Sequence, residues 1–150
     1  MKVSDLMNNC PVTVTPDTPL RQINLLMHRY HLNSVLVTSD DGKLAGIITY
    51  SDLFRQLLPS YEKLMTEEYL LQRPELLEED TVDLINRPVK EVMTGNVKTI
   101  APDTAAVKAG ALMNAHKVKQ LPVVDGDKLV GVISFTDITW GLLLKSAQLF

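Results

Sequence analysis

The sequence predicts a mixed α/β (α+β) fold made of two copies of one small unit. A seven-residue motif occurs twice, as GIITYSD in residues 46–52 and as GVISFTD in residues 131–137. A shared opening also recurs, as VSDLM at residues 3–7 and VKEVM at residues 89–93. The tetrapeptides TPDT and APDT follow these openings in the same register. Self-similarity at a nearly constant spacing indicates a duplicated structural unit.

Each copy is predicted to form a short strand, a helix, two strands and a second helix. The first helix follows Thr18 in copy one and Thr104 in copy two, because threonine is a favoured N-cap residue. In copy one Pro19 then takes the first helical position, which needs no backbone N–H. The apolar residues after it have helical spacing and are Leu20, Ile23, Met27 and Tyr30. In copy two the inner face of this helix is small: Ala106, Ala109 and Gly110.

Two short apolar strands joined by a tight turn come next in each copy. In copy one they are VLVT at residues 35–38 and LAGIIT at residues 44–49, with Asp-Gly at residues 41–42 between them. An Asp-Gly pair between apolar runs is typical of a hairpin turn. Copy two repeats the pattern as LPVV, DGDK and LVGVIS, and both copies return to helical spacing after the final Asp of the motif. The methionines that recur at matched positions are predicted to pack in the core, and are Met7, Met27, Met93 and Met113.

The repeats divide the chain into three parts. Residues 1–55 are predicted to form the first repeat, residues 56–88 an acidic helical insert, and residues 89–150 the second repeat with a C-terminal helix. A repeat of roughly fifty residues buries too little surface to be comfortably stable alone. The two are therefore expected to pack sheet to sheet about a pseudo-twofold axis. The insert carries three basic and eight acidic side chains; it is interpreted as a solvated connector, with a partner-binding surface as the alternative.

Composition narrows the class of protein. The 150 residues are 45% hydrophobic with a net charge of −3, which offers no general attraction to nucleic acid or to acidic membrane surfaces. No apolar run is long enough for a signal peptide or a membrane span. Cys10 is the one cysteine, which rules out an internal disulfide or a cysteine metal cluster. We therefore expect a cytoplasmic protein.

The end of each repeated motif has the chemistry of a nucleotide site. A strand finishes there in hydroxyl-x-hydroxyl-Asp and a helix begins, so free N–H groups and the helix dipole attract phosphate. The hydroxyls add donors, and the carboxylate suits the paired hydroxyls of a ribose. Gly46 and Gly131 would permit close approach to the backbone. The alternative is that Asp52, Asp137 and the hydroxyls only cap their helices.

The duplicated unit resembles a CBS domain pair, also called a Bateman module, of the stand-alone bacterial type. The openings, the TPDT and APDT starts and the doubled ending motif carry this resemblance, which covers nearly the whole chain. The resemblance implies that the clefts between the repeats bind an adenosine-containing ligand: AMP, ADP, ATP, NAD or S-adenosylmethionine. It implies a regulatory module that signals to a partner protein and is not an enzyme. No cofactor is obligatory, and no catalytic or metal-binding residue is predicted.

In the family the clefts are built crosswise, which implies two candidate nucleotide sites. The first groups the end of copy two with copy one, and comprises Ser134, Thr136, Asp137, Thr15, His31, Leu32 and Asn33. The second groups the end of copy one with copy two, and comprises Thr49, Ser51, Asp52, Ala101, Lys117, Val118 and Lys119. The second site has two lysines where the first has His31, which favours a ligand with more phosphate.

The main alternative is a purely structural dimerisation or docking module with no physiological nucleotide. Its support is the final helix, TWGLLLKSAQLF, which is apolar around most of its circumference. Such a helix is usually buried, and a twofold homodimer interface would bury it. The predicted partners are thus an adenosine-containing small molecule, a second copy of the chain and an unidentified regulated protein. Neither nucleic acid nor a membrane is expected as a partner.

Overall fold

The computed structural model describes residues 1–57 and 83–147, which pack into two compact units. Unit 1 comprises Met1–Val12, Thr38–Leu44 and Asn96–Phe150, and unit 2 comprises Thr13–Val37 and Ala45–Gly95. Most of the insert predicted at residues 56–88 lies outside the described residues, as do residues 148–150, to which the C-terminal helix was predicted to extend. Each unit is a mixed α and β structure with its own sheet, so the predicted fold class is confirmed.

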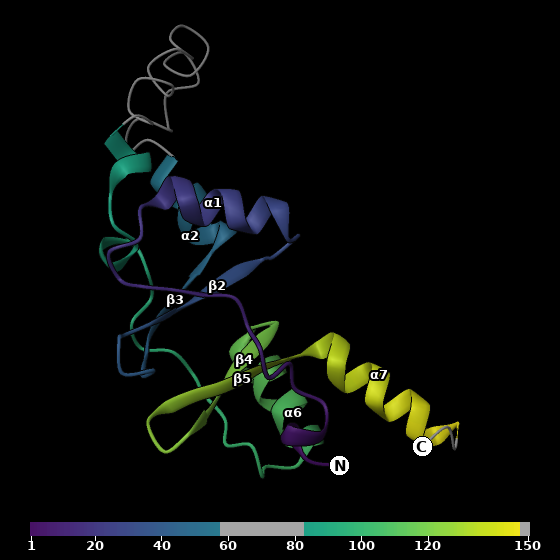
Figure 1. The fold of residues 1–150 in the computed structure, drawn as a ribbon. Helices are drawn as coiled ribbons and strands as arrows, with labels where there is room; N and C mark the ends of the chain where they lie inside the picture. The colour runs from purple at the N-terminus through teal and green to yellow at the C-terminus, as the bar shows by residue number, and fades with distance from the viewer. Residues whose placement is uncertain (58–82, 148–150) are drawn as a thin grey trace, which may run out of the picture. The chain divides into compact units, whose positions relative to one another are not determined.

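Unit 2 contains the strands and helices of the first repeat, except that Thr38 at the end of β2 and Leu44 at the start of β3 belong to unit 1. The elements are β1 (Thr13–Val14), α1 (Leu20–Arg29), β2 (Ser34–Thr38), β3 (Leu44–Thr49) and α2 (Tyr50–Leu57). The sheet order is β1-β2-β3, with β1 parallel to β2. Helices α1 and α2 lie on the same side of this sheet (Figure 1). The predicted strand–helix–strand–strand–helix order is therefore confirmed for the first repeat.

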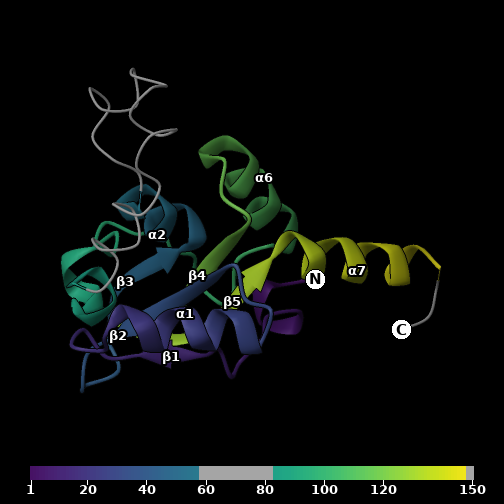
Figure 2. The same cartoon turned by 90° about the horizontal axis from the view of Figure 1, so that it is seen from above.

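Unit 1 contains the elements of the second repeat. They are α6 (Ala106–His116), β4 (Gln120–Asp125), β5 (Lys128–Ser134) and α7 (Phe135–Ser146). Strands β4 and β5 are antiparallel, and a single parallel bridge from Ile100 to Val123 takes the place that β1 has in unit 2. Helix α7 continues directly from the end of β5 (Figure 2). The second repeat thus has the predicted helix, hairpin and second helix, while its first strand is reduced to one bridge.

Each unit has its own hydrophobic core, and the predicted methionines contribute to both. Met27 in unit 2 and Met113 in unit 1 are fully buried. Met93 and Met7 are partly buried and pack against the same two clusters. The prediction of core methionines at matched repeat positions is confirmed.

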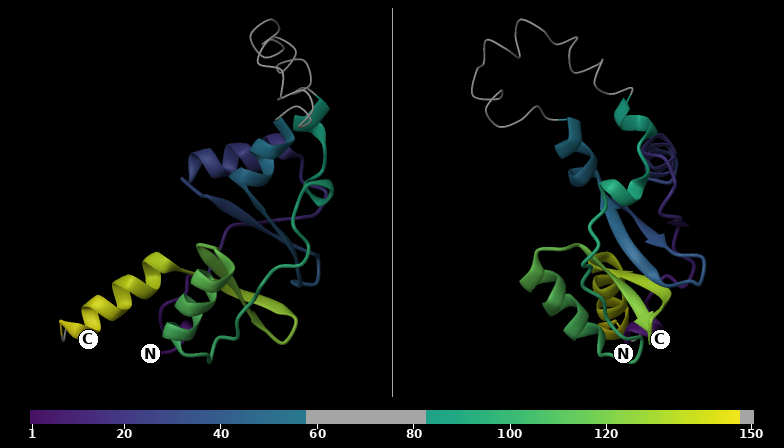
Figure 3. Two further views of the ribbon diagram at one scale, coloured as in Figure 1. Left: turned by 180° about the vertical axis from the view of Figure 1, so that it is seen from behind. Right: turned by 90° about the vertical axis from the view of Figure 1, so that its left-hand side faces the viewer.

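The opening of each repeat packs against the other repeat. We call residues 1–8 the first opening segment and residues 87–94 the second. The first lies in unit 1, beside α6 (Figure 3), where Val3 is buried in the core formed by the second repeat. The second lies in unit 2, where Val89 is buried in the core formed by the first repeat. Both segments contain a short 3-10 helix, Val3–Asp5 and Val89–Glu91. Each repeat therefore contributes its opening segment to the core of the other repeat in the same way.

The opening segments also cap the first helix of each unit, which corrects the prediction made from the threonines. Neither Thr18 nor Thr104 is an N-cap, because α1 and α6 begin at Leu20 and Ala106 and neither has a side-chain cap. The first N–H group of α1 donates instead to the Arg87 carbonyl at 3.0 Å. The first N–H of α6 donates in the same way to the Met1 carbonyl at 3.1 Å.

This capping by distant backbone explains why the local signal was misleading. A helix N-terminus needs acceptors for its free N–H groups, and any acceptor in place removes the need for a side chain. The threonine carbonyls meanwhile hold the incoming segments: Val3 N–H donates to the Thr104 carbonyl and Val89 N–H to the Thr18 carbonyl, both at 2.8 Å.

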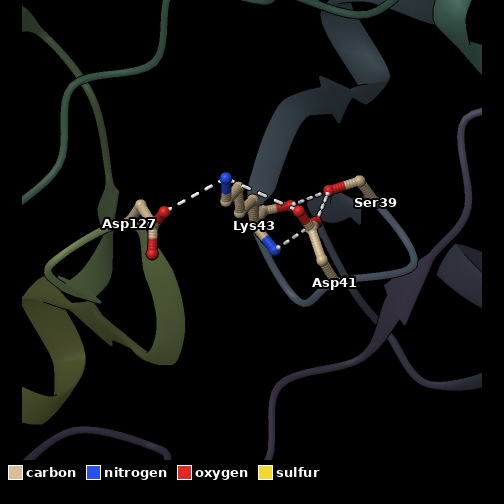
Figure 4. Close-up of polar contacts among 4 residues, drawn as sticks. All are labelled: Ser39, Asp41, Lys43 and Asp127. Atoms are coloured by element: carbon tan, nitrogen blue, oxygen red, sulfur yellow. Dashed lines mark hydrogen bonds and ion pairs between the residues drawn. The ribbon is translucent and has the colours of Figure 1, made fainter.

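The hairpin turns confirm the Asp-Gly prediction and bring a small charged cluster together in unit 1. Gly42 and Gly126 adopt φ values of 79° and 65°, which glycine tolerates best. The Lys43 ammonium lies 3.2 Å from Asp127 and 3.6 Å from Asp41 (Figure 4). The hydrogen bond from the Ser39 hydroxyl is the main cause that lowers the pKa of Asp41, and the bond to Asp127 is the main cause that raises the pKa of Lys43.

The lowered Asp41 pKa has a defined sign for stability. A carboxyl group whose pKa is lower in the folded than in the unfolded chain stabilises the fold at neutral pH, and that stabilisation is lost as the pH falls through the folded-state pKa. All three charged side chains are more than half exposed, so solvent screens the cluster and its contribution to stability is small.

Among the described residues, none of the helices has the length and apolarity that crossing a bilayer requires.

Candidate functional site

The ending motif of the second repeat forms a reciprocal cap at the start of α7. The Ser134 N–H and hydroxyl donate to Asp137 Oδ2 at 2.8 and 2.6 Å, and the Asp137 N–H donates back to Ser134 Oγ at 3.3 Å. This is a capping box, in which the first and fourth residues satisfy each other's backbone donors. It holds the carboxylate in one orientation at the helix N-terminus.

The ending motif of the first repeat has the same arrangement at the start of α2. The Thr49 N–H and hydroxyl donate to Asp52 Oδ2 at 2.9 and 3.0 Å, and the Asp52 N–H donates to Thr49 Oγ1 at 3.2 Å. Asp52 is the buried charged residue of the described chain, with 8% exposure. Its second oxygen, Oδ1, lies 3.6 Å from Arg55 Nη1.

The capping interpretation is thus correct for one oxygen of each carboxylate. The hydroxyls of Ser134 and Thr49 and the Oδ2 atoms of both aspartates all make hydrogen bonds within the caps. Ser134 and Thr49 therefore act as N-cap residues. A carboxylate has about four acceptor positions, and Oδ1 of Asp137 has no hydrogen bond or ion pair from the described residues. Capping therefore leaves Oδ1 of Asp137 outside the cap, and the predicted role of this carboxylate in ligand binding stays a prediction.

The second hydroxyl of each motif and the neighbouring junction complete the local surface. Ser51 and Thr136 are exposed on the first turns of α2 and α7. The first N–H of α7 donates to the Lys119 carbonyl at 3.2 Å, and the first N–H of α2 donates to the Asn33 carbonyl at the same distance. Each helix start therefore lies against the helix-to-strand junction of its own repeat.

The motif glycines serve protein packing, which corrects the idea that they leave room for a ligand. A Cβ on Gly131 would lie 2.8 Å from the Asn8 carbonyl oxygen and 2.8 Å from Met7 Sδ. A Cβ on Gly46 would lie 2.6 Å from Met93 Sδ and 2.8 Å from the Thr94 carbonyl oxygen. The close approach expected at these glycines exists, and the opening segments make it.

The junctions contain a feature that the sequence analysis did not find. His31 and Lys117 both adopt the left-handed backbone conformation, with φ of 52° and 54°. They occupy matched positions in the repeat at the ends of α1 and α6: His31 follows Tyr30, the C-cap of α1, and Lys117 is the C-cap of α6. Glycine is the usual residue in this conformation at a helix end. A side chain in this conformation costs roughly 1–2 kcal/mol, and such residues are enriched at functional sites. The sequence does not predict this strain, because a helix end with positive φ is normally marked by glycine and neither position has one.

The strain at the junctions gives a testable expectation. Replacing His31 or Lys117 by glycine should raise the free energy of unfolding by about 1 kcal/mol, since glycine adopts positive φ without steric cost. Urea denaturation of the single variants measures the change. His28→Gly, inside α1, is the control and should lower stability by about the same amount. Loss of stability at His31→Gly would contradict the assignment of strain.

The other predicted site residues lie on both units. Thr15 is exposed and its hydroxyl pairs with that of Thr18 at 3.1 Å. Leu32 and Val118 are half-buried against the two cores, and Asn33, Ala101 and Lys119 are exposed. The structure brings Thr49 to Asp52 and Ser134 to Asp137. The crosswise grouping joins residues of different units and stays a prediction.

Comparison with known proteins now gives the family. The family model for the CBS domain matches residues 3–59 and 89–143. The protein MJ1426 of Methanocaldococcus jannaschii is 29% identical and covers 95% of this chain and 92% of its own length. The inosine-5'-monophosphate dehydrogenase of the same organism is 28% identical over 91% of this chain. The chain spans 23% of the length of that dehydrogenase.

Solved structures share the fold over nearly the whole chain. AcuB of Vibrio cholerae, assigned to acetoin utilization, is 27% identical with a TM-score of 0.76 and covers 99% of this chain and 95% of its own. CBSX2, solved in complex with AMP, is 21% identical with a TM-score of 0.74 and covers 97% and 98%. The CBS domain pair of MJ0100, solved with 5-methylthioadenosine and S-adenosyl-L-methionine, is 22% identical with a TM-score of 0.71 and covers 97% and 98%. With two matched segments and a doubled capping motif, this chain belongs to the CBS domain family as a pair of CBS domains.

Proposed function

We propose that the protein is a regulatory module that binds an adenosine-containing ligand and signals its presence to a partner protein. The observation that carries the proposal is the doubled ending motif. Each copy fixes an aspartate at a helix N-terminus through Oδ2 and leaves Oδ1 outside the cap. A rigid carboxylate with an acceptor to spare suits the two adjacent hydroxyls of a ribose.

The helix starts supply the chemistry for the phosphate part of the ligand. Helices α2 and α7 present their positive dipole ends next to the carboxylates, together with the exposed hydroxyls of Ser51 and Thr136. Related proteins were solved with AMP and with S-adenosyl-L-methionine, whose shared part is adenosine. That shared part is what this chain is proposed to recognise.

The two sets of site residues differ in charge, which predicts different ligands. The set with Asp52 includes Lys117 and Lys119, while the set with Asp137 includes His31. Lysine adds a charge-assisted contact to each phosphate that it reaches. We therefore expect ATP or ADP to prefer the set with Asp52, and AMP or S-adenosylmethionine to be accepted by the set with Asp137.

A ligand titration tests the proposed function. The full chain is mixed with AMP, ADP, ATP, NAD and S-adenosylmethionine, and the unfolding temperature is followed. A ligand at a hundred times its dissociation constant raises the free energy of unfolding by about 2.7 kcal/mol. Cytidine monophosphate is the control for nonspecific phosphate binding. If none of the adenosine compounds stabilises the chain more than this control, the proposal is wrong.

Replacing the aspartates by asparagine separates ligand binding from capping. In Asp137→Asn the amide oxygen still accepts from the Ser134 N–H, but the other position becomes a donor and no longer accepts ribose hydroxyls. We expect affinity at that site to fall about tenfold or more, because an unpaired polar contact in a binding site costs about 1–3 kcal/mol. Asp52→Asn should weaken the other site, as isothermal titration calorimetry would show.

The matched control for this prediction removes the cap and keeps the carboxylate. Ser134→Ala should lower the free energy of unfolding by about 0.5–2 kcal/mol, as loss of a cap does, while ligand affinity changes less than in Asp137→Asn. If Asp137→Asn loses stability as Ser134→Ala does but keeps full affinity, the aspartate is a cap alone.

A second candidate function is dimerisation or docking without a nucleotide, and one observation favours it. Helix α7 carries large apolar side chains that unit 1 leaves exposed: Phe135, Trp140, Leu142 and Leu143. Trp140 and Leu143 are 56% and 65% exposed, and a second copy of the chain would cover them. Analytical ultracentrifugation, with Leu143→Glu as the disrupting variant, tests for a homodimer. A dimer that no adenosine compound stabilises would favour this candidate over the ligand sensor.

A further inference from the structure

The two aspartates of the ending motifs differ in what faces their second oxygen. In unit 2 the Arg55 guanidinium lies 3.6 Å from Asp52 Oδ1, three residues along α2. In unit 1 the position that matches Arg55 in the repeat is Trp140, which has no charge to offer. The described residues place no hydrogen bond or ion pair on Asp137 Oδ1. The repeats are therefore alike in their caps and unlike at the oxygen proposed to meet the ribose.

The carboxylate that faces the arginine is also the more buried of the two. The Asp52 side chain is 11% exposed, whereas Asp137 is half-buried. Oδ2 of Asp52 accepts two hydrogen bonds from Thr49, so the oxygen left outside the cap is Oδ1, which Arg55 faces. A ribose hydroxyl that donates to this oxygen competes with the guanidinium for the same lone pairs.

We infer that Arg55 sets the affinity of the Asp52 site by competing with the ribose for Asp52 Oδ1. The site with Asp137, which has tryptophan at the matched position, takes the ribose without this competition. Arg55 is thus a specificity-determining residue that makes two otherwise similar sites unequal. The inference rests on the proposed function, because it concerns the same carboxylates.

The size of the effect follows from the exposure of the arginine. Its side chain is 70% exposed, and an ion pair at this level of exposure is weak and is screened by salt. Removing the competitor should therefore strengthen ribose binding at the Asp52 site only about two- to fivefold. The same effect should appear in the protein with Arg55 intact when salt screens the pair.

Adenosine is the probe that isolates this contact. It carries the ribose and no phosphate, so it does not report a gain or loss of phosphate contacts by the arginine. Binding is measured by calorimetry in the full chain with Asp137→Asn, which is expected to weaken the other site about tenfold or more. The affinity for adenosine is compared between the protein with Arg55 intact, Arg55→Ala and Arg55→Lys. Gln56→Ala is the control for loss of a neighbouring exposed polar side chain on α2.

Arg55→Ala is expected to lower the dissociation constant for adenosine about two- to fivefold, Arg55→Lys to change it less, and Gln56→Ala to leave it unchanged. Added salt should strengthen adenosine binding with Arg55 present and not in Arg55→Ala. In Asp52→Asn the substitution Arg55→Ala should have no effect, because the two residues act through one contact.

The failures of the two proposals are distinguishable. If adenosine binds and Arg55→Ala weakens it or leaves it unchanged, the competition is absent and this inference is wrong while the ligand sensor stands. If adenosine and the nucleotides bind neither the wild type nor Arg55→Ala, both proposals are wrong.

Discussion

Met113→Ala and Met27→Ala should each lower the free energy of unfolding by about 2–5 kcal/mol. Both side chains are fully buried, one in the core of each unit. Truncation removes their apolar contacts and leaves a cavity, and the two costs add. The free energy of unfolding in urea measures the loss, which in heat amounts to about 2–4 °C for each kcal/mol in a protein of this size.

Exposed apolar residues on the same two helices supply matched controls. Val107 on α6 is 63% exposed and Leu25 on α1 is 61% exposed. Their replacement by alanine should change the free energy of unfolding by no more than about 0.5 kcal/mol. Equal effects from Met113→Ala and Val107→Ala would contradict the burial of Met113.

Gly131→Ala and Gly46→Ala should each cost about 1–3 kcal/mol through overpacking. The added methyl group would lie within 3 Å of a methionine sulfur and of a backbone carbonyl oxygen. A methionine side chain adapts, but the carbonyls of Asn8 and Thr94 are fixed by backbone hydrogen bonds to β5 and β3, at 2.9–3.0 Å. The opening segment must therefore move away from the strand.

This displacement has a local signature besides lost stability. In Gly131→Ala the amide of Asn8, which donates to the Val132 carbonyl, should exchange its hydrogen faster. Gly95→Ala is the control, because a Cβ there meets nothing closer than 4.0 Å. Unchanged protection at Asn8 in a stable Gly131→Ala protein would show that the close contact is not present in solution.

Local sequence signals predicted the elements that depend on local physics. The β-branched runs became β3 and β5 within a residue of their expected ends, and the Asp-Gly turn formed with Gly42 at positive φ. Matched methionines lie in the cores because period and apolarity decide burial. In the candidate site, the sequence indicated both the caps and the carboxylates, since hydroxyl and acid stand three residues apart.

The features that could not be predicted from the sequence, or were predicted wrongly, depend on tertiary structure. Thr18 and Thr104 are good N-cap residues, yet the backbone carbonyls of Arg87 and Met1 lie against the helix starts instead. Arg55 was not singled out because an exposed arginine has no distinctive spacing until its distance to Asp52 is known. The strain at His31 and Lys117 likewise depends on dihedral angles that no residue type announces.

The sequence by itself determined that this protein is one unit made twice, with a capped aspartate at the end of each copy. The structure alone decided that each copy gives its opening segment to the other, with Val3 in the core of the second repeat and Val89 in the core of the first. The physical reason is the repetition itself. The two opening segments have nearly the same sequence pattern, and the two cores that they pack against are nearly equivalent. Local sequence preference therefore does not decide whether an opening segment packs on its own repeat or on the other one. Only the tertiary packing of the folded chain decides this.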